Sequence, residues 1–274
     1  MRRVEPAMNK PLFAVVLVVA TFSIAAKDHS TKASAPNRCE KPVYLTFDTG
    51  HMGVAPLIAE VLDRQQVKVT FFAANERTKE GDGSLGEHWA PWWKARAAKG
   101  DAFASHTFDH TYWRADGPGS TFRVKPSAGP NAGAERTVSA ADYCAEIARS
   151  SDRLEAITGV KPLPLFRAPG GKTSPALLAA AKACGYAHVG WASAGFLGDE
   201  LPSERFSNPA LLQKALRDIR PGDILLAHLG IWSRKEPWAP AVLEPLIVGL
   251  KAKGFCFLTL RDDPDYAAWF AQHR

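Results

Sequence analysis

The stretch YLTFDTGHMG, residues 44–53, contains the pattern that decides the fold of this chain. A run of aromatic and β-branched residues leads up to Asp48 and is followed at once by a Thr-Gly pair. This is the pattern of a short, buried strand that ends in a turn. Similar apolar runs recur along the chain and alternate with segments of helical periodicity. Such alternation predicts a parallel α/β sheet, either open or closed into a barrel.

The sequence predicts seven strands and six helices. The strands are expected at residues 43–48, 67–73, 102–106, 164–167, 186–191, 224–229 and 255–260. The helices are expected at residues 53–64, 89–99, 139–158, 174–184, 208–218 and 239–253. Two connections, residues 74–88 and 111–138, are rich in Gly, Pro and charged residues and are predicted to be loops. Loops of this length inside a compact domain usually carry function.

The N-terminus has the layout of an export signal. Three basic residues among the first ten precede an uncharged, mostly apolar run from Pro11 to Ala26 that ends in small residues. We predict a signal peptide at residues 1–25, with an uncleaved membrane anchor as the alternative, and a polar linker at 26–38. Residues 39–274 show no repeat or internal linker and are predicted to form one domain. The mature protein is therefore expected in the periplasm or outside the cell.

Charge and cysteine content narrow the classes of partner. The formal charge is +6, but no cluster of Lys and Arg is interleaved with aromatic residues, so nucleic-acid binding is not expected. A mildly basic surface suits a polyanionic cell-wall polymer. None of the four cysteines, Cys39, Cys144, Cys184 and Cys256, belongs to a CxxC pair. They allow two disulfides with three alternative pairings, or buried free thiols.

Polar residues of catalytic type stand where the predicted strands end, the edge at which functional side chains gather in parallel α/β folds. They are Asp48 after the first strand, His106 and His110 of SHTFDH (105–110) after the third, Arg167 of LFRAPGG (165–171) after the fourth, Trp191 after the fifth and His228 of LLAHLG (225–230) after the sixth. Each residue alone has a structural explanation, as a cap, a half-buried histidine or a core tryptophan. Their shared edge favours one functional site.

These residue types suit metal-assisted hydrolysis. The two histidines of SHTFDH are spaced so that both imidazoles can bind one Zn²⁺, which polarises a carbonyl group and lowers the pKa of bound water. Asp48 is the candidate general base, which Arg167 would hold ionised, and His228 is the candidate acid for the leaving atom. A backbone N–H near Gly170 is a candidate donor to the developing oxyanion.

Five motifs in a fixed order carry a resemblance to a known family. They are TFDTG (46–50), SHTFDH, RAPGG (167–171), the segment at Trp191 and LLAHL (225–229). In this order they resemble the polysaccharide deacetylases of carbohydrate esterase family 4, the NodB homology domain, over residues 40 to about 262. The resemblance implies a distorted (β/α)7 barrel. It also implies metal-dependent removal of N-acetyl groups from the amino sugars of an N-acetylated polysaccharide or peptidoglycan.

The resemblance gives roles to residues of the first three motifs. Asp48 corresponds to the catalytic base and Arg167 to the residue that orients it. His106 and His110 correspond to ligands of a divalent metal, expected to be zinc. The third ligand of the family is a second aspartate, and Thr49 stands in its place. A neutral hydroxyl binds Zn²⁺ poorly, so we expect a site that is weak, that recruits water or Asp48, or that has lost its metal; the muramic-acid deacetylase branch, which this chain also resembles, lacks the same aspartate.

The later motifs depart from the family at two further positions. His228 corresponds to the general acid, and Trp191 to the start of the fourth motif. The tyrosine usual in the third motif is Gly170, and we predict that Gly170 and Trp191 contact the substrate. The aspartate usual in the fourth motif is Ala194, for which Asp199 is a candidate displaced substitute.

Two functions of different classes fit this pattern. One is a deacetylase, and the other is a secreted carbohydrate-binding protein whose deacetylase site has decayed. The departures favour the second, but the base, both histidines, the arginine and the acid candidate are all present, so we predict the enzyme. A nucleotide-binding loop at GGKTS (170–174) is not expected, because Phe166 stands where such a loop requires glycine. Six aromatic residues in or beside the two long connections are candidates to stack on sugar rings: Trp89, Trp92, Trp93, Tyr112, Trp113 and Phe122. For Trp89, Trp92 and Trp93 the alternative is a buried helix face.

Overall fold

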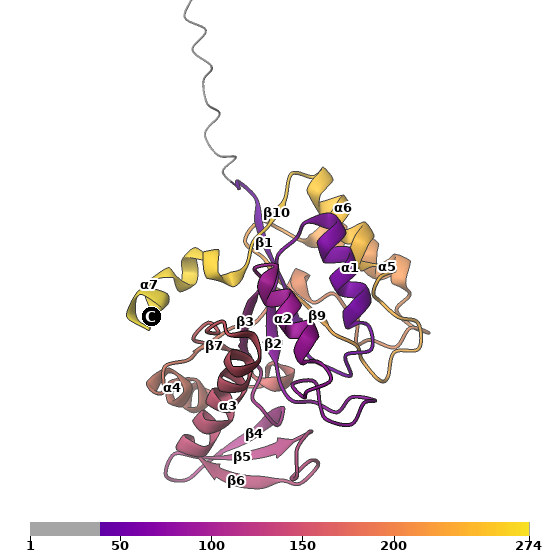
Figure 1. Cartoon of the computed structure of the whole chain (residues 1–274). Coiled ribbons are helices and arrows are strands. Elements are labelled where there is room, and N and C mark those ends of the chain that lie inside the picture. The colour runs from indigo at the N-terminus through magenta and orange to yellow at the C-terminus, as the bar shows by residue number, and fades with distance from the viewer. Residues whose placement is uncertain (1–38, 274) are drawn as a thin grey trace, which may run out of the picture. The chain divides into compact units, whose positions relative to one another are not determined.

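Strand β1 (Pro42–Asp48) lies at the centre of the computed structural model, which describes residues 39–273 (Figure 1). The predicted signal peptide and linker lie outside these residues, and both stay predictions. None of the described helices is long and apolar enough to cross a membrane. The other strands of the main sheet are β2 (Thr70–Ala73), β3 (Ala102–Ser105), β7 (Leu165–Phe166), β8 (Ala187–His188), β9 (Ile224–His228) and β10 (Cys256–Phe257). The helices are α1 (Ala55–Gln65), α2 (Ala90–Ala98), α3 (Ala140–Thr158), α4 (Pro175–Ala183), α5 (Asn208–Asp218), α6 (Leu243–Ala252) and α7 (Pro264–Gln272).

The main sheet is parallel and curls into a closed ring. Strand β1 pairs with β2 and β9 along its C-terminal part and with β10 at its start. From β2 the sheet continues through β3 and β7 to β8. Residues 192–197 then run beside β9, where the N–H of Ala192 donates to the Ile224 carbonyl (3.1 Å) and that of Leu197 to the Leu226 carbonyl (3.2 Å). The seven strands therefore form the distorted (β/α)7 barrel that the resemblance implied.

Side chains along β1 alternate between the hydrophobic core and the polar site at the end of the barrel. Val43, Leu45 and Phe47 are fully buried and belong to the cluster that also contains the apolar faces of α1 and α6. Burying a side chain of this size contributes about 1.5–3 kcal/mol. Thr46 and Asp48 fall on the opposite face, because successive residues of a strand point to opposite sides. The core thus fixes the direction in which the carboxylate of Asp48 points.

The segment 111–138, predicted to be a loop, instead carries a small antiparallel sheet. Its strands are β4 (Thr111–Gly117), β5 (Thr121–Pro126) and β6 (Arg136–Ser139). Alternation in β5 explains the sheet: Phe122 and Val124 are buried in a cluster with Tyr143 of α3, whereas Arg123 between them is exposed. The abundance of Gly, Pro and charge concealed this two-residue period. The other long connection, residues 74–88, contains neither helix nor strand, as predicted.

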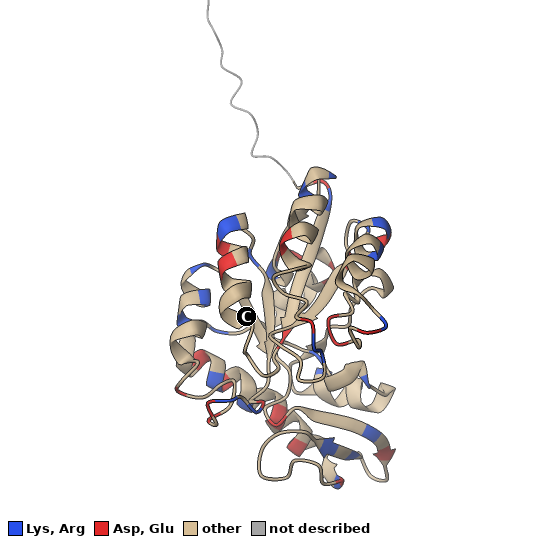
Figure 2. Ribbon diagram, turned by 90° about the vertical axis from the view of Figure 1, so that its right-hand side faces the viewer, with Lys and Arg blue, Asp and Glu red and all other residues tan. Residues whose placement is uncertain are grey.

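All seven predicted strands and six predicted helices are present, with shorter strands late in the chain, and α7 is an additional helix that the sequence did not predict. The cysteines form two disulfides, one of the alternatives left open. Cys39 pairs with Cys256 (Cα–Cα 5.9 Å) and Cys144 with Cys184 (6.3 Å). Figure 2 shows basic and acidic residues interspersed over the described helices and loops.

Candidate active site

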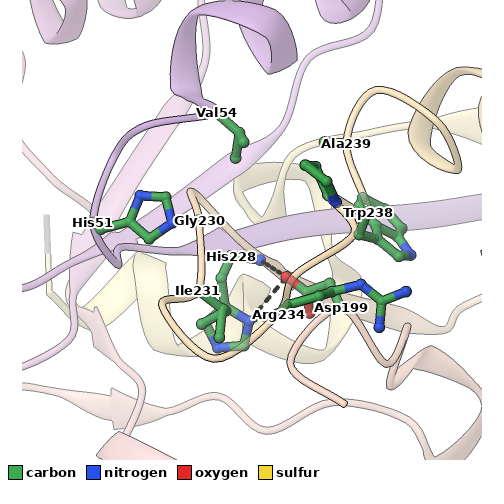
Figure 3. Close-up of a pocket in the computed structure, with 10 residues that line it drawn as sticks. His51, Val54, Asp199, His228, Gly230, Ile231, Arg234, Trp238 and Ala239 are labelled. Carbon is green, nitrogen blue, oxygen red and sulfur yellow. Dashed lines mark hydrogen bonds and ion pairs between the residues drawn. The ribbon is translucent and has the colours of Figure 1, made fainter. Parts of the chain in front are cut away.

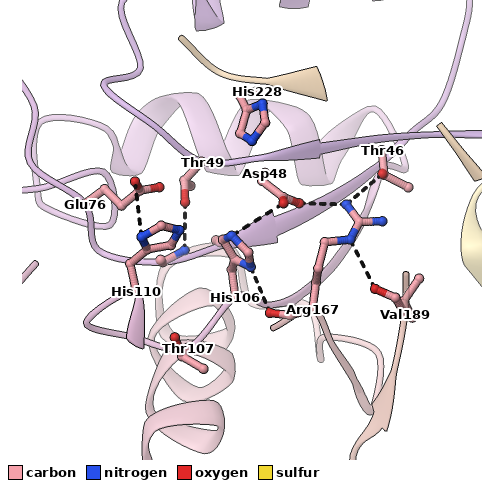
Figure 4. A network of polar contacts seen from close by, with 12 residues as sticks. Thr46, Asp48, Thr49, Glu76, His106, Thr107, His110, Arg167, Val189 and His228 are labelled. Atoms are coloured by element: carbon pink, nitrogen blue, oxygen red, sulfur yellow. Dashed lines mark hydrogen bonds and ion pairs between the residues drawn. The ribbon is translucent and has the colours of Figure 1, made fainter. Parts of the chain in front are cut away.

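The motif segments converge at the C-terminal rim of the barrel, as predicted (Figure 4). Asp48, the last residue of β1, is in register with His228 at the end of β9. Strands β3 and β7, which lead into His106 and Arg167, are paired with each other. Residues from distant parts of the chain therefore meet at one edge, because the parallel strands that carry them all end there.

Arg167 is fully buried and holds the carboxylate of Asp48. Its Nη1 donates to Asp48 Oδ1 (2.7 Å) and to Thr46 Oγ1 (2.9 Å), and its Nε donates to the Val189 carbonyl (3.2 Å). The guanidinium also lies 4.1 Å from the centre of the Phe72 ring. Burial by itself would raise the pKa of Asp48, but the charge and hydrogen bond of Arg167, together with the neighbouring histidines His106 and His228, outweigh it and lower that pKa below its usual value. The carboxylate is therefore ionised at neutral pH and fixed in direction.

His106 presents an unprotonated nitrogen to Asp48. Its Nδ1 lies 2.8 Å from the carbonyl oxygen of Arg167, and a carbonyl only accepts, so Nδ1 carries the proton. Burial lowers the pKa of His106 to about 4, which leaves the ring neutral. Its Nε2 lone pair then lies 3.4 Å from Asp48 Oδ2. Two buried acceptors face each other, an arrangement that a cation or a proton between them would relieve.

His110 lies beside His106 because the SHTFDH segment folds back on itself. Thr107 and His110 both have positive φ (60° and 48°), and the two imidazole ring centres are 4.8 Å apart. Nδ1 of His110 lies 2.5 Å from Ser127 Oγ of the segment after β5 and 3.8 Å from Glu76 Oε1 of the 74–88 loop. As in His106, Nδ1 contacts the protein and Nε2 is left for another partner.

Thr49 has a structural contact of its own. Its side chain is buried, and its Oγ1 accepts a hydrogen bond from the N–H of Ala74 (3.0 Å), the residue that follows β2. The hydroxyl therefore anchors the start of the 74–88 loop.

The donors at this rim suit a divalent metal, although no three His, Cys, Asp or Glu side chains among residues 39–273 meet as a ready-made cluster. Two imidazoles engaged through Nδ1 leave Nε2 as donors, the usual arrangement of metal-binding histidines. The 3.4 Å between His106 Nε2 and Asp48 Oδ2 is close to the spacing of two donors around a tetrahedral Zn²⁺ with bonds of about 2.0–2.1 Å. His106 and His110 are the residues that would hold the ion, with the Asp48 carboxylate next to it.

His228 has a carboxylate partner, and it is the displaced candidate Asp199 (Figure 3). Asp199 Oδ2 accepts from the backbone N–H of His228 (2.7 Å), and both carboxylate oxygens lie near its Nδ1 (3.1 and 3.2 Å). Burial alone would lower the pKa of His228, but the charge and hydrogen bond of Asp199 raise it to about 9. His228 is therefore protonated at neutral pH, the state that a general acid needs.

Two consecutive glycines shape the opposite wall of the site. Gly170 and Gly171 have φ near +65°, and a Cβ would lie 2.9 Å from the ring of Tyr112 at the first and 2.6 Å from the ring of Trp191 at the second. The Tyr112 ring in turn lies 4.9 Å from that of His110. Tyr112, from β4, thus fills space above the glycine that stands in the place of the family tyrosine.

An exposed tryptophan lies beside the loop that follows Asp48. Trp232 is 59% exposed, and its ring lies 4.7 Å from that of His51, in the loop that follows Asp48. The His51 ring is held in turn over Gly230, where a Cβ would lie 2.4 Å from the imidazole. His51 and Gly230 also line a pocket beside His228 (Figure 3).

Most aromatic candidates of the sequence turn out to be structural. Trp89, Trp93 and Phe122 are buried in the core, and Trp92 packs against it, whereas Tyr112 lies at the site. The sequence did not indicate Glu76, Ser127 or Trp232. Glu76 lies in a loop expected to be functional, which was the one signal pointing toward it.

The comparison with known families agrees with this geometry. Residues 35–189 match the family model described as polysaccharide deacetylase. The match covers more than half of the chain, and the chain belongs to this family. By family it is a carbohydrate deacetylase, a hydrolase that acts on amide bonds.

The similarity to individual relatives is low in sequence identity but extends over most of the chain. The chain is 28% identical over 231 residues to a chitooligosaccharide deacetylase of Azorhizobium caulinodans, covering 81% of this chain and 93% of that protein. It is 25% identical over 228 residues to a peptidoglycan-N-acetylmuramic acid deacetylase of Bacillus subtilis, covering 82% and 72%. Its fold is similar to a family 4 acetyl xylan esterase from Clostridium thermocellum solved with a cobalt ion, with a TM-score of 0.61, 22% identity and coverage of 81% and 89%.

Proposed function

We propose that this protein removes N-acetyl groups from the amino sugars of a cell-wall or extracellular polysaccharide, using a divalent metal, zinc, held by His106 and His110. The observation that carries the proposal is the pair of opposed ionisation states at one rim. Asp48 is an ionised carboxylate held by Arg167, and His228, in register with it on the adjacent strand, is protonated by virtue of Asp199. A base and an acid on either side of one position are what amide hydrolysis requires.

The chain's own residues account for the proton transfers. Asp48 takes a proton from the attacking water, and Arg167 keeps its carboxylate aimed and ionised throughout. His228 gives its Nε2 proton to the leaving nitrogen, while Asp199 stabilises the imidazolium until that moment. The backbone at Gly170 is the predicted donor to the oxyanion. When bound, a divalent metal would polarise the acetyl carbonyl and lower the pKa of the attacking water.

The substrate class is proposed from the relatives and the rim. The two relatives are named for chitooligosaccharide and for N-acetylmuramic acid of peptidoglycan, both N-acetylated amino-sugar compounds. Trp191, Tyr112 and Trp232 offer aromatic surfaces for sugar rings. Amphipathic aromatic rings are well suited to such contacts.

Export to the periplasm or the cell exterior is part of the proposal. The N-terminal segment has the layout of a signal, and the two disulfides, Cys39–Cys256 and Cys144–Cys184, support an oxidising compartment. The N-terminal segment would act as a cleaved signal, or alternatively as an anchor.

One assay tests the proposed function. Purified protein is incubated with chitooligosaccharides and, separately, with peptidoglycan, and acetate release is measured with added Zn²⁺ and with a chelator. Release that depends on metal and is lost in Asp48→Asn is the expected result. Sugar binding without acetate release from any N-acetylated substrate would instead identify the carbohydrate-binding alternative.

A further inference from the structure

We infer that Glu76 is a positioning residue of the metal site, and that it acts by holding the proton of His110 on Nδ1. The role of Glu76 in metal binding rests on the proposed function, in which His106 and His110 hold a metal. The tautomer of His110 itself does not depend on the activity, and it is measured separately below.

The loop that carries Glu76 is pinned to the barrel rim. The backbone N–H of Glu76 donates to Ser84 Oγ (2.9 Å), and the N–H of Ser84 donates back to the Glu76 carbonyl (2.9 Å). Ser84 Oγ also donates to the carbonyl of Ala74, whose own N–H donates to Thr49 (2.5 and 3.0 Å). The 74–88 loop therefore delivers the Glu76 side chain to a fixed place, and Thr49 is one of its anchors.

The carboxylate of Glu76 faces the site. Its side chain is only 20% exposed, and Oε1 lies 3.8 Å from His110 Nδ1 (Figure 4). Within residues 39–273, no Lys or Arg side chain forms an ion pair with it. A half-buried carboxylate beside one nitrogen of an imidazole favours the tautomer that carries its proton on that nitrogen.

Both neighbours of His110 Nδ1 can accept its proton. Ser127 Oγ lies 2.5 Å from Nδ1 and also within reach of the His110 carbonyl (3.4 Å), so its hydroxyl can donate to that carbonyl and accept from the ring N–H. The Glu76 carboxylate can only accept. The proton therefore belongs on Nδ1, and Nε2 keeps the lone pair that a metal requires. His106 achieves the same tautomer through the Arg167 carbonyl (2.8 Å).

The charge of Glu76 matters because residue 49 carries none. An aspartate at that position would bring a negative charge to the ion, and Thr49 brings only a hydroxyl that is already engaged with Ala74. A carboxylate behind a ligating histidine raises the basicity of the ring, and loss of such a partner typically lowers metal affinity 10–100-fold. Glu76 thus strengthens the site from behind His110.

The first experiment reads the tautomer in the metal-free protein. Long-range ¹H–¹⁵N NMR at neutral pH should show His110 protonated on Nδ1, with His106 as an internal reference for that state. Glu76→Gln places an amide, which can donate, near Nδ1, and should raise the population protonated on Nε2 at His110 while leaving His106 unchanged. Glu87→Gln is the matched control, because Glu87 lies in the same loop but pairs with Arg153 (2.7 Å). An unchanged His110 spectrum in Glu76→Gln would overturn the inference.

The second experiment is calorimetric titration with Zn²⁺. Glu76→Gln should bind about 10–100-fold more weakly than wild type, and Glu87→Gln equally well. Binding within about twofold of wild type would overturn the positioning role. Weaker binding without a change in the His110 tautomer would make Glu76 a direct ligand and would also overturn it. If the expected tautomer is found in a protein that releases no acetate, the proposed function alone is contradicted.

Discussion

The histidines on the two sides of Asp48 have opposite surroundings. His228 has a carboxylate on its Nδ1 side, Asp199, close enough to raise its pKa to about 9. His106 has only a carbonyl oxygen on its Nδ1 side. Its burial lowers its pKa to about 4. One rim therefore contains an imidazole built to carry a proton and another built to offer a lone pair. The comparison shows that the role of each histidine is set by its Nδ1 partner more than by its place in a motif.

Of the substitutions considered, removing the negative charge of Asp48 should have the largest effect on the rate of deacetylation. Asp48→Asn keeps the shape of the side chain but removes the base, and should lower the rate of deacetylation by about 10²–10⁴. Steady-state acetate release measures it, and circular dichroism verifies the fold. A rate within a few-fold of wild type would remove Asp48 from the mechanism.

Asp199→Asn should make His228 resemble His106. Without the carboxylate its two raising effects are lost while burial still disfavours the charged ring, so the pKa of His228 should fall well below about 9. The alkaline limb of the pH–rate profile should move to lower pH, with a loss of at least about tenfold at pH 8.

The His228–Asp199 pair also predicts how the stability of the fold changes with pH. A raised pKa stabilises the fold fully below the unfolded value of 6.5, and this contribution is lost as pH rises through about 9. Wild type should therefore lose more stability than Asp199→Asn between pH 6.5 and 9, as measured by urea denaturation. Equal losses would mean that the His228–Asp199 pair is not formed.

Thr49→Asp tests how residue 49 contributes to the affinity for Zn²⁺. An added anionic ligand should tighten Zn²⁺ binding by about tenfold. Calorimetry of wild type, Thr49→Asp and His106→Ala measures this. The last variant should bind far more weakly, and binding equal to wild type would exclude the histidines as the site.

The smallest effect is expected at the exposed edge of the rim. Trp232→Ala should raise KM for long chitooligosaccharides about three- to tenfold with little change in kcat, because a stacking surface is lost and the reacting groups are untouched. Trp232→Phe should restore most of the affinity. Val248→Ala, which also shortens an exposed apolar side chain (49% exposed, in α6), is the control. An equal change for monomeric and long substrates would place the tryptophan outside the binding surface.

The sequence was sufficient for the parts of the fold that depend on local pattern. Apolar runs ending in polar residues located all seven barrel strands and brought Asp48, Arg167 and His228 to one edge. The sequence was insufficient where the alternation of apolar and polar residues is short and flanked by Gly and Pro, as in β5. It also could not place Glu76, because nothing local indicates that the 74–88 loop folds back to His110. Asp199 could be named but not positioned, since its contact with His228 depends on the path of residues 192–199.

The disulfide between Cys39 and Cys256 turns the barrel into a covalent circle. The two cysteines are 217 residues apart, so the bond encloses nearly the whole domain. Any single backbone cut between them leaves the two pieces joined, and a nicked molecule would run as one species until it is reduced. Closing a loop of this size contributes about 5 kcal/mol in the chain-entropy account, comparable with the entire stability of many domains. We therefore expect thiol reductants to inactivate the protein under conditions that leave every residue of the catalytic rim chemically unchanged.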